Sequence, residues 1–359
     1  MKMISEGKAR IYTGDGVFYN PKMSQLRDIS VLFLKAVSAR KSRVLDSTAA
    51  TGVRAIRYSL EAGAKDVTLL EINRKAYNYA KRNARLNKLK LKIINTSIQE
   101  FANTHRGSFD VVDLDPFGSP APNIFDIMKL SWDGTILMIT ATDTAVLCGA
   151  HEGACVKIYG SKPLHNEMCK EAGIRILLSY TAKVASQFNF GIVPLLSISD
   201  MHYMRIFLRL EFGAQKAIDS VKTTGLGTFC RKCYSFTFAR GVAPSIQQTC
   251  SKCGSRMEAF GPLWLGRLYE KEMIKKMLGK KSIPLLNTIY EELDVPMFYS
   301  IPKVTKNIGI SSVSHHKAIE KLRKMGRIAT LTQFEDEAIK TDATTQEVIK
   351  AVRSLKQRT

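Results

Sequence analysis

The sequence predicts an α/β protein in which a Rossmann-like N-terminal domain precedes an α+β C-terminal domain. Three observations support this prediction. Apolar strand-like runs alternate with helix-like segments over the first ~220 residues, two close cysteine pairs follow near residue 230, and the chain becomes helical and basic from about residue 267. We expect domains at 1–222 and 223–359, the second with a four-cysteine module at 226–256 and a winged-helix-like part at 267–335.

Five apolar runs are expected to form parallel strands of one sheet, with the helices between them as crossovers. These runs lie within residues 42–52, 65–73, 89–101, 107–118 and 133–143. A helix is expected from Val53, a basic helix over residues 73–87, a later helix over residues 174–190 and a further strand over Met204–Phe212. In the C-terminal part, residues 283–293 and 303–334 indicate helices, a turn and a β-hairpin wing.

The composition indicates a polyanionic partner. Lys and Arg number 54 against 32 Asp and Glu, which gives a net charge of +22 and a pI near 9.7. Nucleic acid is the usual partner of such a charge, although a solvated thermophile surface and an anionic membrane are alternatives. No apolar run is long enough to span a bilayer, and residues 1–10 lack the apolar core of a signal peptide. The seven cysteines do not resemble a disulfide framework, so a reducing cytoplasm fits.

Residues 45–52 and Glu71 together indicate a nucleoside site. A loop of small residues after the first strand lets a ligand approach the start of a helix, and an acidic residue at the end of the second strand can accept hydrogen bonds from ribose hydroxyls. The loop contains a single glycine, Gly52, where a dinucleotide site would have three. This favours a ligand without phosphates, such as S-adenosylmethionine (SAM), over NAD. The alternative is a plain turn with a surface Glu71.

The stretch "DLDPFGSP" ends the fourth strand with two carboxylates, Asp113 and Asp115. Methyltransferases that act on exocyclic amines place an acidic or polar residue, proline and an aromatic ring there, and "DPFG" is a variant. An exocyclic amine is a poor nucleophile, so it must be aimed at the methyl donor. We expect Asp115 to accept one amine hydrogen, the carbonyl of Pro116 to accept the other, and Phe117 to stack on the base. Asp113 is either close enough to raise one carboxyl pKa or a structural partner of a backbone or arginine group.

The cysteine pairs predict a metal site. Cys230 and Cys233 form one C-x2-C pair, Cys250 and Cys253 form the other, and 16 residues separate the pairs. This spacing is typical of a four-thiolate zinc site in a zinc-ribbon-like insertion. Such a site is structural, because four thiolates leave no open position for water. Two disulfides are the alternative.

Seven stretches in order resemble one family, the tRNA (guanine-N2)-dimethyltransferases. They read VFYNPKMSQLRD, DSTAATGVRAIRY, DLDPFGSP, TATDTAVLCGAH, YGSKPLHNEMCKEAGIRILL, FGPLWLG and LDVPMFY, and they cover nearly the whole chain. The resemblance implies a Rossmann-like class I SAM methyltransferase fold and mono- or dimethylation of the N2 amine of guanine 26 in tRNA. It also implies tRNA as the partner, and no obligate protein partner is evident. The chain length and the absence of extra basic tails suggest a cytoplasmic protein of archaeal or bacterial type and not a nuclear one.

The same resemblance implies a set of site residues. The cofactor-binding residues are Arg27, Asp46, Thr51, Gly52, Arg54, Arg57, Glu71, Ser97 and Ile98. The arginines would clamp the methionyl carboxylate or order the loop around it, with Arg54 and Arg57 as alternatives to each other. An ion pair that covers the sheet is the other role open to these arginines. Ser97 or the backbone of Ile98 would bond the adenine, although the family often has an aspartate there. Thr140 and Asp143 would line the pocket for the base.

Two other functions remain open at this point. An amino-methyltransferase acting on DNA adenine or on another RNA target is compatible with "DPFG" alone, but the full set of stretches disfavours it. A non-catalytic protein that binds nucleic acid through its zinc ribbon and winged helix would bind no SAM. Residues suited to SAM chemistry at three strand ends, Gly52, Glu71 and Asp115, count against this second alternative.

Overall fold

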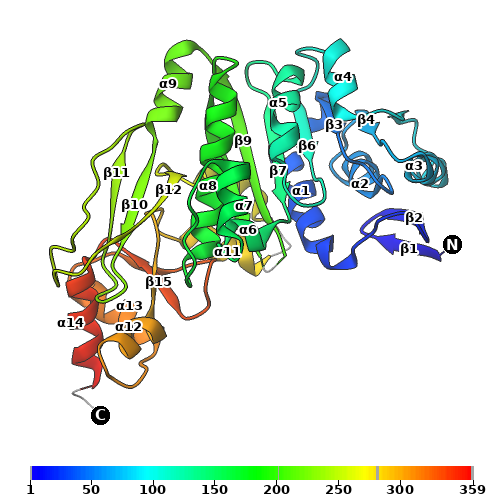
Figure 1. The fold of residues 1–359 in the computed structure, drawn as a ribbon. Coiled ribbons are helices and arrows are strands. Elements are labelled where there is room, and N and C mark those ends of the chain that lie inside the picture. Colours follow the sequence, from blue (N-terminus) through cyan, green and yellow to red (C-terminus); the bar gives the residue numbers. More distant parts are fainter. Residues whose placement is uncertain (1, 201, 280–282, 357–359) are drawn as a thin grey trace. The chain divides into compact units, whose positions relative to one another are not determined.

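The protein is described by a computed structural model that covers residues 2–200, 202–279 and 283–356 (Figure 1). The chain forms two compact units. The first comprises residues 2–142, 184–195 and 205–217, and the second comprises the other described residues. Each unit is therefore made of several separate segments of the chain. The sequence analysis expected a single boundary after residue 222, which remains a prediction about domains.

A seven-stranded sheet organises the first unit, with the strand order β5-β4-β3-β6-β7-β9-β8. Its strands are β3 (Arg43–Asp46), β4 (Asp66–Leu70), β5 (Lys92–Ile94), β6 (Val111–Leu114), β7 (Ile136–Ala141), β8 (Phe190–Ser199) and β9 (Met204–Phe212). The adjacent strands in the part β5-β4-β3-β6-β7 of this order all pair in parallel. The α/β prediction with a mostly parallel central sheet is therefore confirmed.

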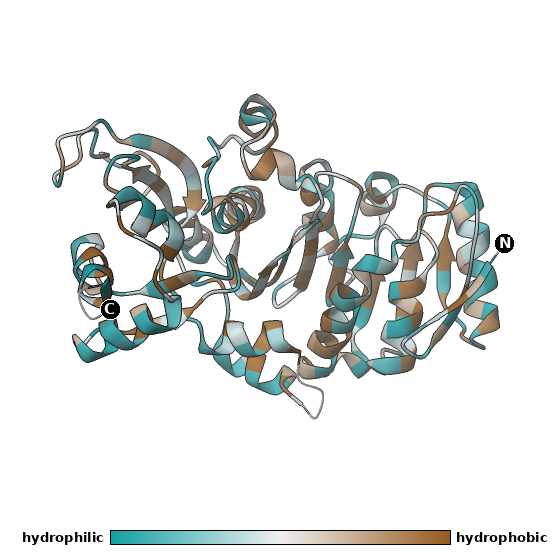
Figure 2. Ribbon diagram, turned by 90° about the horizontal axis from the view of Figure 1, so that it is seen from below, coloured by the Kyte–Doolittle hydropathy of each residue, from teal (hydrophilic) through white to brown (hydrophobic). Residues whose placement is uncertain are grey.

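Crossover helices follow these strands because their apolar positions recur at helical spacing and bury one face. The elements of this unit besides the sheet are β1 (Lys2–Glu6), β2 (Ala9–Thr13), α1 (Ser24–Ala36), α2 (Val53–Glu61), α3 (Arg74–Leu86), α4 (Ile98–Thr104), α5 (Ala121–Leu130) and the 3-10 turns η1 (Pro21–Met23) and η2 (Ala39–Lys41). Every residue of β6 is buried. Figure 2 shows the strands at the centre of the sheet as mostly apolar, which is typical of a parallel sheet covered on both faces.

The N-terminal hairpin of β1 and β2 packs on the helices beside the first crossover. Ala9 and Ile11 pack against Val53 and Ile56 of α2. The fully buried Asn83 of α3 accepts a hydrogen bond from the backbone N–H of Tyr12 at 2.7 Å and donates to the carbonyl oxygen of Thr51 at 2.9 Å. One amide side chain therefore holds both the hairpin and the loop that follows β3.

The second unit contains two three-stranded sheets, ordered β11-β10-β12 and β13-β15-β14. Its strands are β10 (Thr224–Phe229), β11 (Phe236–Arg240), β12 (Glu258–Trp264), β13 (Tyr299–Ser300), β14 (Ala329–Leu331) and β15 (Ala338–Thr341). Its helices are α6 (Thr144–Leu147), α7 (Glu152–Tyr159), α8 (Cys169–Ser186), α9 (Ala214–Lys222, which begins in the first unit), α10 (Lys271–Met277), α11 (Pro284–Glu291), α12 (Ile301–Asn307), α13 (His315–Lys324) and α14 (Thr345–Lys356).

A buried ion-pair group ties α8 to the C-terminal sheet within this unit. Glu171 pairs with Arg175 at 2.8 Å and with Lys340 of β15 at 3.1 Å, and all three side chains are fully buried. Glu171 also accepts the backbone N–H of Met297 at 2.8 Å. Buried charges of this kind are tolerated only when paired, so the group fixes how these segments pack. Of the helices in the described parts of the chain, none combines the length and the apolar character needed to cross a membrane.

Candidate active site and metal centre

The loop after β3 turns sharply at a glycine. Gly52 has φ of 76° and precedes α2. A Cβ at this position would lie 3.2 Å from Leu69 and 3.4 Å from Ala80, so both the backbone conformation and the space favour glycine. The backbone N–H of Ala49 donates to the carbonyl oxygen of Leu70 at 3.0 Å, which holds the loop against β4.

Glu71 follows β4 and fastens the same loop. One carboxylate oxygen accepts the backbone N–H of Ala50 at 2.7 Å, and the other accepts that of Asn73 at 2.7 Å. Each carboxylate oxygen has a second acceptor site, so Glu71 can accept further hydrogen bonds from a ligand at the loop. Its role toward a ribose remains a prediction.

Five charged side chains meet at the carboxyl ends of β3 and β6. Arg54 donates to Asp115 at 2.5 and 2.8 Å, and Arg205 pairs with Asp113 at 2.8 Å. Asp46 is next to Asp113 in the pairing of β3 with β6. When all five side chains are ionised, three carboxylates and two guanidinium groups carry one negative charge in excess. We call these five residues the buried charge cluster.

Asp46 is the least satisfied member of the buried charge cluster. Its side chain is 1 % exposed, and neither carboxylate oxygen has a hydrogen-bond partner among the described residues. Burial, and then the charge of Asp113, raises the pKa of Asp46 to about 7 against the opposing charge of Arg54. One guanidinium nitrogen of Arg54, Nη1, is likewise buried without a partner in the described chain.

Asp115 differs from Asp46 in both protonation and exposure. Burial would raise its pKa, but the positive charges of Arg54 and Arg205 hold the pKa below its usual value. The backbone N–H of Asp115 donates to the hydroxyl of Thr48 at 3.0 Å, and its side chain is 19 % exposed. Asp115 is therefore an ionised hydrogen-bond acceptor that a ligand can reach.

Phe117 projects from the turn after β6. Its side chain is 70 % exposed, and it meets Phe18 edge-to-face with ring centroids 4.2 Å apart. The backbone N–H of Gly118 donates to the hydroxyl of Thr142 at 2.7 Å, which fixes the turn. An exposed aromatic ring on a fixed turn offers a stacking surface.

The structure answers the question about Asp113. Its carboxylate pairs with Arg205 and also accepts the hydroxyl hydrogen of Tyr58, and its side chain is fully buried. Its backbone oxygen accepts two hydrogen bonds from Ser47, at 2.7 and 2.9 Å. Asp113 is thus a structural partner, one of the two roles considered from the sequence. Thr140 is buried too, and its hydroxyl accepts a hydrogen bond from Arg205 at 2.5 Å.

Arg27 and Arg57 lie in an ion-pair network beneath the N-terminal hairpin. Arg27 binds the buried Glu6 at 2.5 and 2.6 Å, and Arg57 binds the same carboxylate at 2.9 Å. Arg57 also pairs with Asp28 and Glu61. Arg57 is thereby surrounded by three carboxylates, whereas Arg54 lies in the buried charge cluster.

The other predicted residues have local roles in this structure. Ser97 caps α4 by accepting the backbone N–H of Glu100 at 3.1 Å, and Ile98 is buried at the start of that helix. Thr51 is buried in the glycine loop. Asp143, in the second unit, accepts the hydroxyl hydrogen of Tyr159 at 2.9 Å. Their contacts with cofactor or substrate remain predictions.

The four predicted cysteines come together in the second unit. Their sulfur atoms all lie within 4.8 Å of one another, with Cys230 and Cys253 3.5 Å apart and Cys233 and Cys250 3.4 Å apart. Tetrahedral zinc with bonds of about 2.3 Å needs sulfurs roughly 3.8 Å apart, so the cluster fits this ion. All four cysteines are free thiols.

Each cysteine pair is held by its own backbone turn, and the two turns are of the same kind. The N–H of Cys230 donates to the carbonyl oxygen of Ser235 at 2.8 Å, and that of Cys250 donates to the carbonyl oxygen of Ser255 at 2.8 Å. Gly254 has φ of 70°, as the second turn requires. Two matching turns, one before β11 and the other before β12, present the thiols to a common centre.

Arg205 and Phe18 are residues of the site that sequence reasoning missed. Arg205 is a fully buried charge within the apolar strand β9, and a charge in such a strand is a signal that a carboxylate must be near. Phe18, 49 % exposed, stands in one of the seven stretches but was not singled out as a partner of Phe117.

The parallel sheet, the single-glycine loop and the acidic residues at three strand ends define a Rossmann-like nucleoside-binding protein of the methyltransferase class. Comparison with known proteins gives the particular family. Residues 1–353 match the family described as TRM, N2,N2-dimethylguanosine tRNA methyltransferase. The chain belongs to this family.

Similar proteins cover almost the whole chain. The tRNA (guanine(26)-N(2))-dimethyltransferase of Thermococcus kodakarensis is 36% identical over 95% of this chain and 96% of its own length. The enzyme of the same name from Methanobrevibacter smithii is 33% identical, over 94% and 92%. The structure of Trm1 from Pyrococcus horikoshii in complex with S-adenosyl-L-methionine matches with a TM-score of 0.91 at 32% identity, covering 98% of this chain and 100% of that chain.

Proposed function

We propose that this protein transfers one or two methyl groups from SAM to the exocyclic N2 amine of guanine 26 in tRNA. One observation carries the proposal: in a member of this family, the ionised Asp115 and the exposed ring of Phe117 follow a central parallel strand. The named relatives are guanine-26 dimethyltransferases, and the solved relative is a complex with SAM, which supports both the substrate and the methyl donor.

The charges of the site fit SAM. The partnerless oxygens of Asp46 suit the methionyl ammonium, and the partnerless Nη1 of Arg54 suits the methionyl carboxylate. The excess negative charge of the buried charge cluster complements the positive sulfur. When bound, SAM supplies an electrophilic methyl group. Among the α2 arginines we assign the cofactor contact to Arg54, because Arg57 is already held by three carboxylates.

The remainder of the cofactor site follows the sequence-based assignments. Glu71 accepts hydrogen bonds from the ribose hydroxyls, and Gly52 with Thr51 lets the cofactor approach the loop. Ser97 and the backbone of Ile98 meet the adenine edge. Arg27 acts at a distance by holding Glu6 and the N-terminal segment over the loop.

Asp115 orients the amine. Its lowered pKa keeps the carboxylate ionised, so it accepts one N–H of the guanine amine while the carbonyl oxygen of Pro116 accepts the other. These two acceptors aim the nitrogen lone pair at the methyl group. Strong basicity is unnecessary, because the amine becomes acidic once it is methylated and then releases its proton readily. Arg54 fixes the carboxylate by two hydrogen bonds.

Phe117 stacks on the extruded guanine, with Phe18 supporting the ring from its edge. Thr140 acts on the site by positioning Arg205. The role of Asp143 in base binding stays a prediction from the family stretch.

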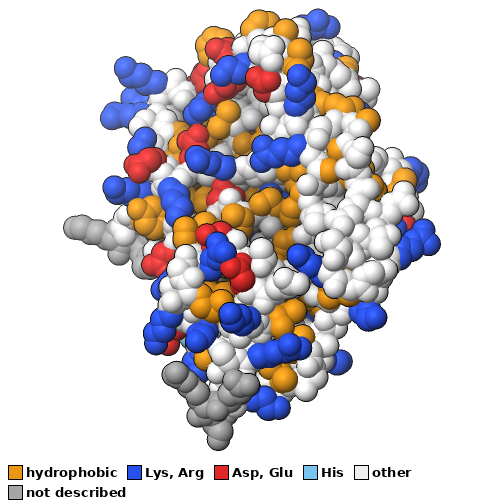
Figure 3. Space-filling model, turned by 90° about the vertical axis from the view of Figure 1, so that its left-hand side faces the viewer, with side chains coloured by type: hydrophobic (Ala, Val, Ile, Leu, Met, Phe, Trp, Pro, Cys, Tyr) orange, Lys and Arg blue, Asp and Glu red, His pale blue; other side chains and the backbone are white. Residues whose placement is uncertain are grey.

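The second unit is proposed to bind tRNA. Its cysteine cluster would hold a structural zinc in a zinc-ribbon-like module with β10, β11 and β12. Helices α12 and α13 with the sheet β13-β15-β14 would form a winged-helix-like part. Figure 3 shows Lys and Arg side chains spread over one face of the molecule with fewer acidic ones among them, which suits a phosphate backbone. The free thiols fit a cytoplasmic protein.

Transfer from radiolabelled SAM to unmodified tRNA transcripts tests the proposal. Wild-type protein should label a transcript with guanine 26 and leave a transcript with adenine 26 unlabelled. Equal labelling of both transcripts contradicts the proposed position and favours an amino-methyltransferase of another target.

Variants of Asp115 test the assigned chemistry. Asp115→Ala should lose at least 100-fold in turnover while still binding SAM and tRNA, since it removes the acceptor that aims the amine. Turnover within tenfold of wild type would remove Asp115 from this role.

A further inference from the structure

A basic segment with no acidic residue begins next to the cofactor loop. Residues 74–92 contain eight Lys or Arg and no Asp or Glu. They are Arg74, Lys75, Lys81, Arg82, Arg85, Lys88, Lys90 and Lys92, and all are exposed except the half-buried Lys81. The segment consists of α3, the loop that leads into β5 and the first residue of β5.

Four of these side chains lie on one stripe of α3. At 100° per residue, Arg74, Lys81, Arg82 and Arg85 fall within about 100° of arc. The opposite face is buried and carries small or amide side chains, Ala76, Ala80, Asn83 and Ala84. The charged stripe therefore faces away from the sheet, where a partner can reach it.

The stripe connects two edges of the sheet. Because α3 returns from the end of β4 to the start of β5, it runs from the carboxyl ends of the parallel strands, where Glu71 lies, to their amino ends. Its 13 residues span about 20 Å. This length matches several consecutive phosphates of a nucleic acid strand and exceeds a single free phosphate or nucleotide.

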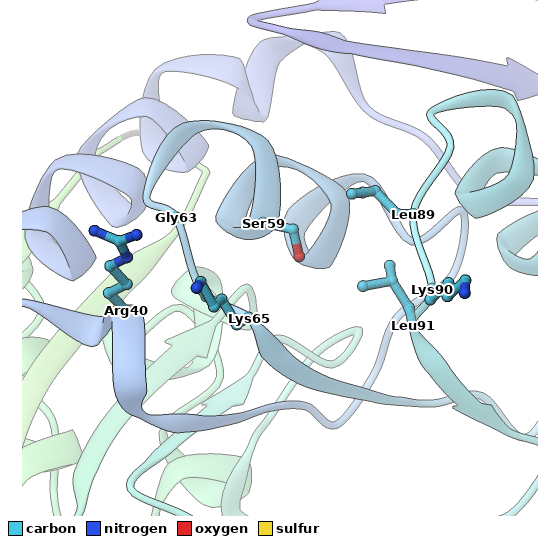
Figure 4. Close-up of a pocket in the computed structure, with 8 residues that line it drawn as sticks. Arg40, Ser59, Gly63, Lys65, Leu89, Lys90 and Leu91 are labelled. Atoms are coloured by element: carbon cyan, nitrogen blue, oxygen red, sulfur yellow. The ribbon is translucent and has the colours of Figure 1, made fainter.

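A cavity lies at the far end of the stripe (Figure 4). It has a volume of about 600 Å³, and its lining includes the cations Arg40, Lys65 and Lys90 and no acidic residue among the described lining residues. In Figure 4 Arg40 and Lys65 lie on one side and Lys90 on the other, with Ser59 between them. The hydroxyl of Ser59 is buried and has no hydrogen-bond partner in the described part of the chain. The three cations come from separate segments, η2, the loop after α2 and the loop before β5.

We propose that the α3 stripe and this cavity form a docking track for the RNA backbone, in which the Ser59 hydroxyl and the three cations hold one phosphate. The inference rests on the proposed function, because it concerns tRNA. While guanine 26 reaches Asp115 at one edge of the sheet, an adjoining part of the same tRNA follows α3 to the other edge. The track supplies affinity independent of sequence, since cations that contact phosphates do not read bases.

The test measures the affinity of the full chain for unmodified tRNA as a function of salt. Lys65→Glu and Lys90→Glu should each weaken binding about tenfold and lower the slope of log K against log salt by roughly one. Ser59→Ala should weaken binding a few-fold without lowering the melting temperature, because its hydroxyl has no partner in the free protein. Arg106→Glu, an exposed residue after α4 with the same charge change, is the control.

Two outcomes overturn the docking track. The first outcome is that Lys65→Glu and Lys90→Glu have the same tRNA affinity and salt slope as Arg106→Glu. The effect then comes from the net charge of the protein and not from a docking track. The second outcome has two parts: millimolar inorganic phosphate stabilises the wild type but not Ser59→Ala, and Lys65→Glu and Lys90→Glu bind tRNA as the wild type does. This outcome assigns the cavity to a free phosphoryl ligand. If wild-type protein binds tRNA but methylates no guanine 26, the proposed function fails, while the track is still judged by binding alone.

Discussion

Replacing Asp46 by asparagine separates the stability of the buried charge cluster from its function. The substitution keeps the shape of the side chain and removes one buried negative charge that has no hydrogen-bond partner among the described residues. We expect Asp46→Asn to stabilise the free protein at pH 8 and to weaken SAM binding. A site built to receive a positively charged ligand should be destabilised while that ligand is absent.

The magnitude follows from the pKa of about 7, compared with an ordinary value of 3.8. The folded protein keeps the Asp46 proton up to about pH 7, whereas the unfolded chain releases it near pH 4. Stability is therefore lost as the pH rises between these values, by about 1.4 kcal/mol for each pH unit, or up to roughly 4 kcal/mol in total. Asp46→Asn should recover up to this amount at pH 8 and little at pH 4.

The affinity for SAM should rise with pH over the range in which the stability of the free protein falls. Below pH 7 the wild-type affinity should fall as Asp46 takes up a proton, by up to about tenfold per pH unit. Above about pH 8 it should fall again, because the ammonium of the ligand loses its proton. Asp46→Asn should bind SAM roughly 30-fold or more weakly at pH 8 and lack the acid limb, since a buried charge pair is broken.

Denaturation of the free protein at pH 4 and pH 8, with calorimetric titration of SAM across the same range, measures both effects. Asp66→Asn, which changes an exposed aspartate at the start of β4, is the matched control and should change neither quantity. The reasoning is refuted if Asp46→Asn destabilises the protein at pH 8, or if it binds SAM as the wild type does.

Two further predictions concern the base and the metal. Phe117→Ala should lower kcat/KM for tRNA about 10- to 100-fold with unchanged SAM affinity, since stacking is worth about 1–3 kcal/mol per base, while Phe117→Tyr should keep activity; equal activity of both variants would contradict the stacking role. The purified protein should contain one zinc per chain by elemental analysis, and Cys253→Ser or a strong chelator should lower the melting temperature of the second unit. A protein without zinc and with an unchanged melting temperature after chelation would contradict the metal site.

Local signals made part of the site predictable. Glu71 and Asp115 each stand directly after an apolar run, and Gly52 ends the short loop that follows another. The carboxyl ends of parallel strands meet at one edge of a sheet, so the proximity of these residues followed from the order of elements. The cysteine cluster was predictable for a similar reason, because the two cysteines of each pair lie in one short turn. Only the approach of one pair to the other depends on the fold.

Long-range partners could not be read in the same way. Arg205 lies 92 residues beyond Asp113 in the chain, and β9 lies beside β7 in the sheet although three helices and β8 separate them in the sequence. Arg54 and Arg57, three residues apart on α2, looked equivalent in the sequence. Their environments differ because one faces the carboxyl end of β6 and the other faces Glu6 of the N-terminal hairpin.

The sequence by itself determined the α/β class, the alternation of strands and helices along the first part of the chain, the four-thiolate cluster and the family resemblance, because each depends on periodicity, spacing or contiguous motifs. The tertiary structure decided the states of the three aspartates. Asp113 pairs with Arg205 and accepts a hydrogen bond from Tyr58, Asp115 is kept ionised by Arg54, and Asp46 is left with a raised pKa. A carboxyl group's pKa depends on the charges and water within a few ångströms of it, and here those charges come from segments far apart in the chain.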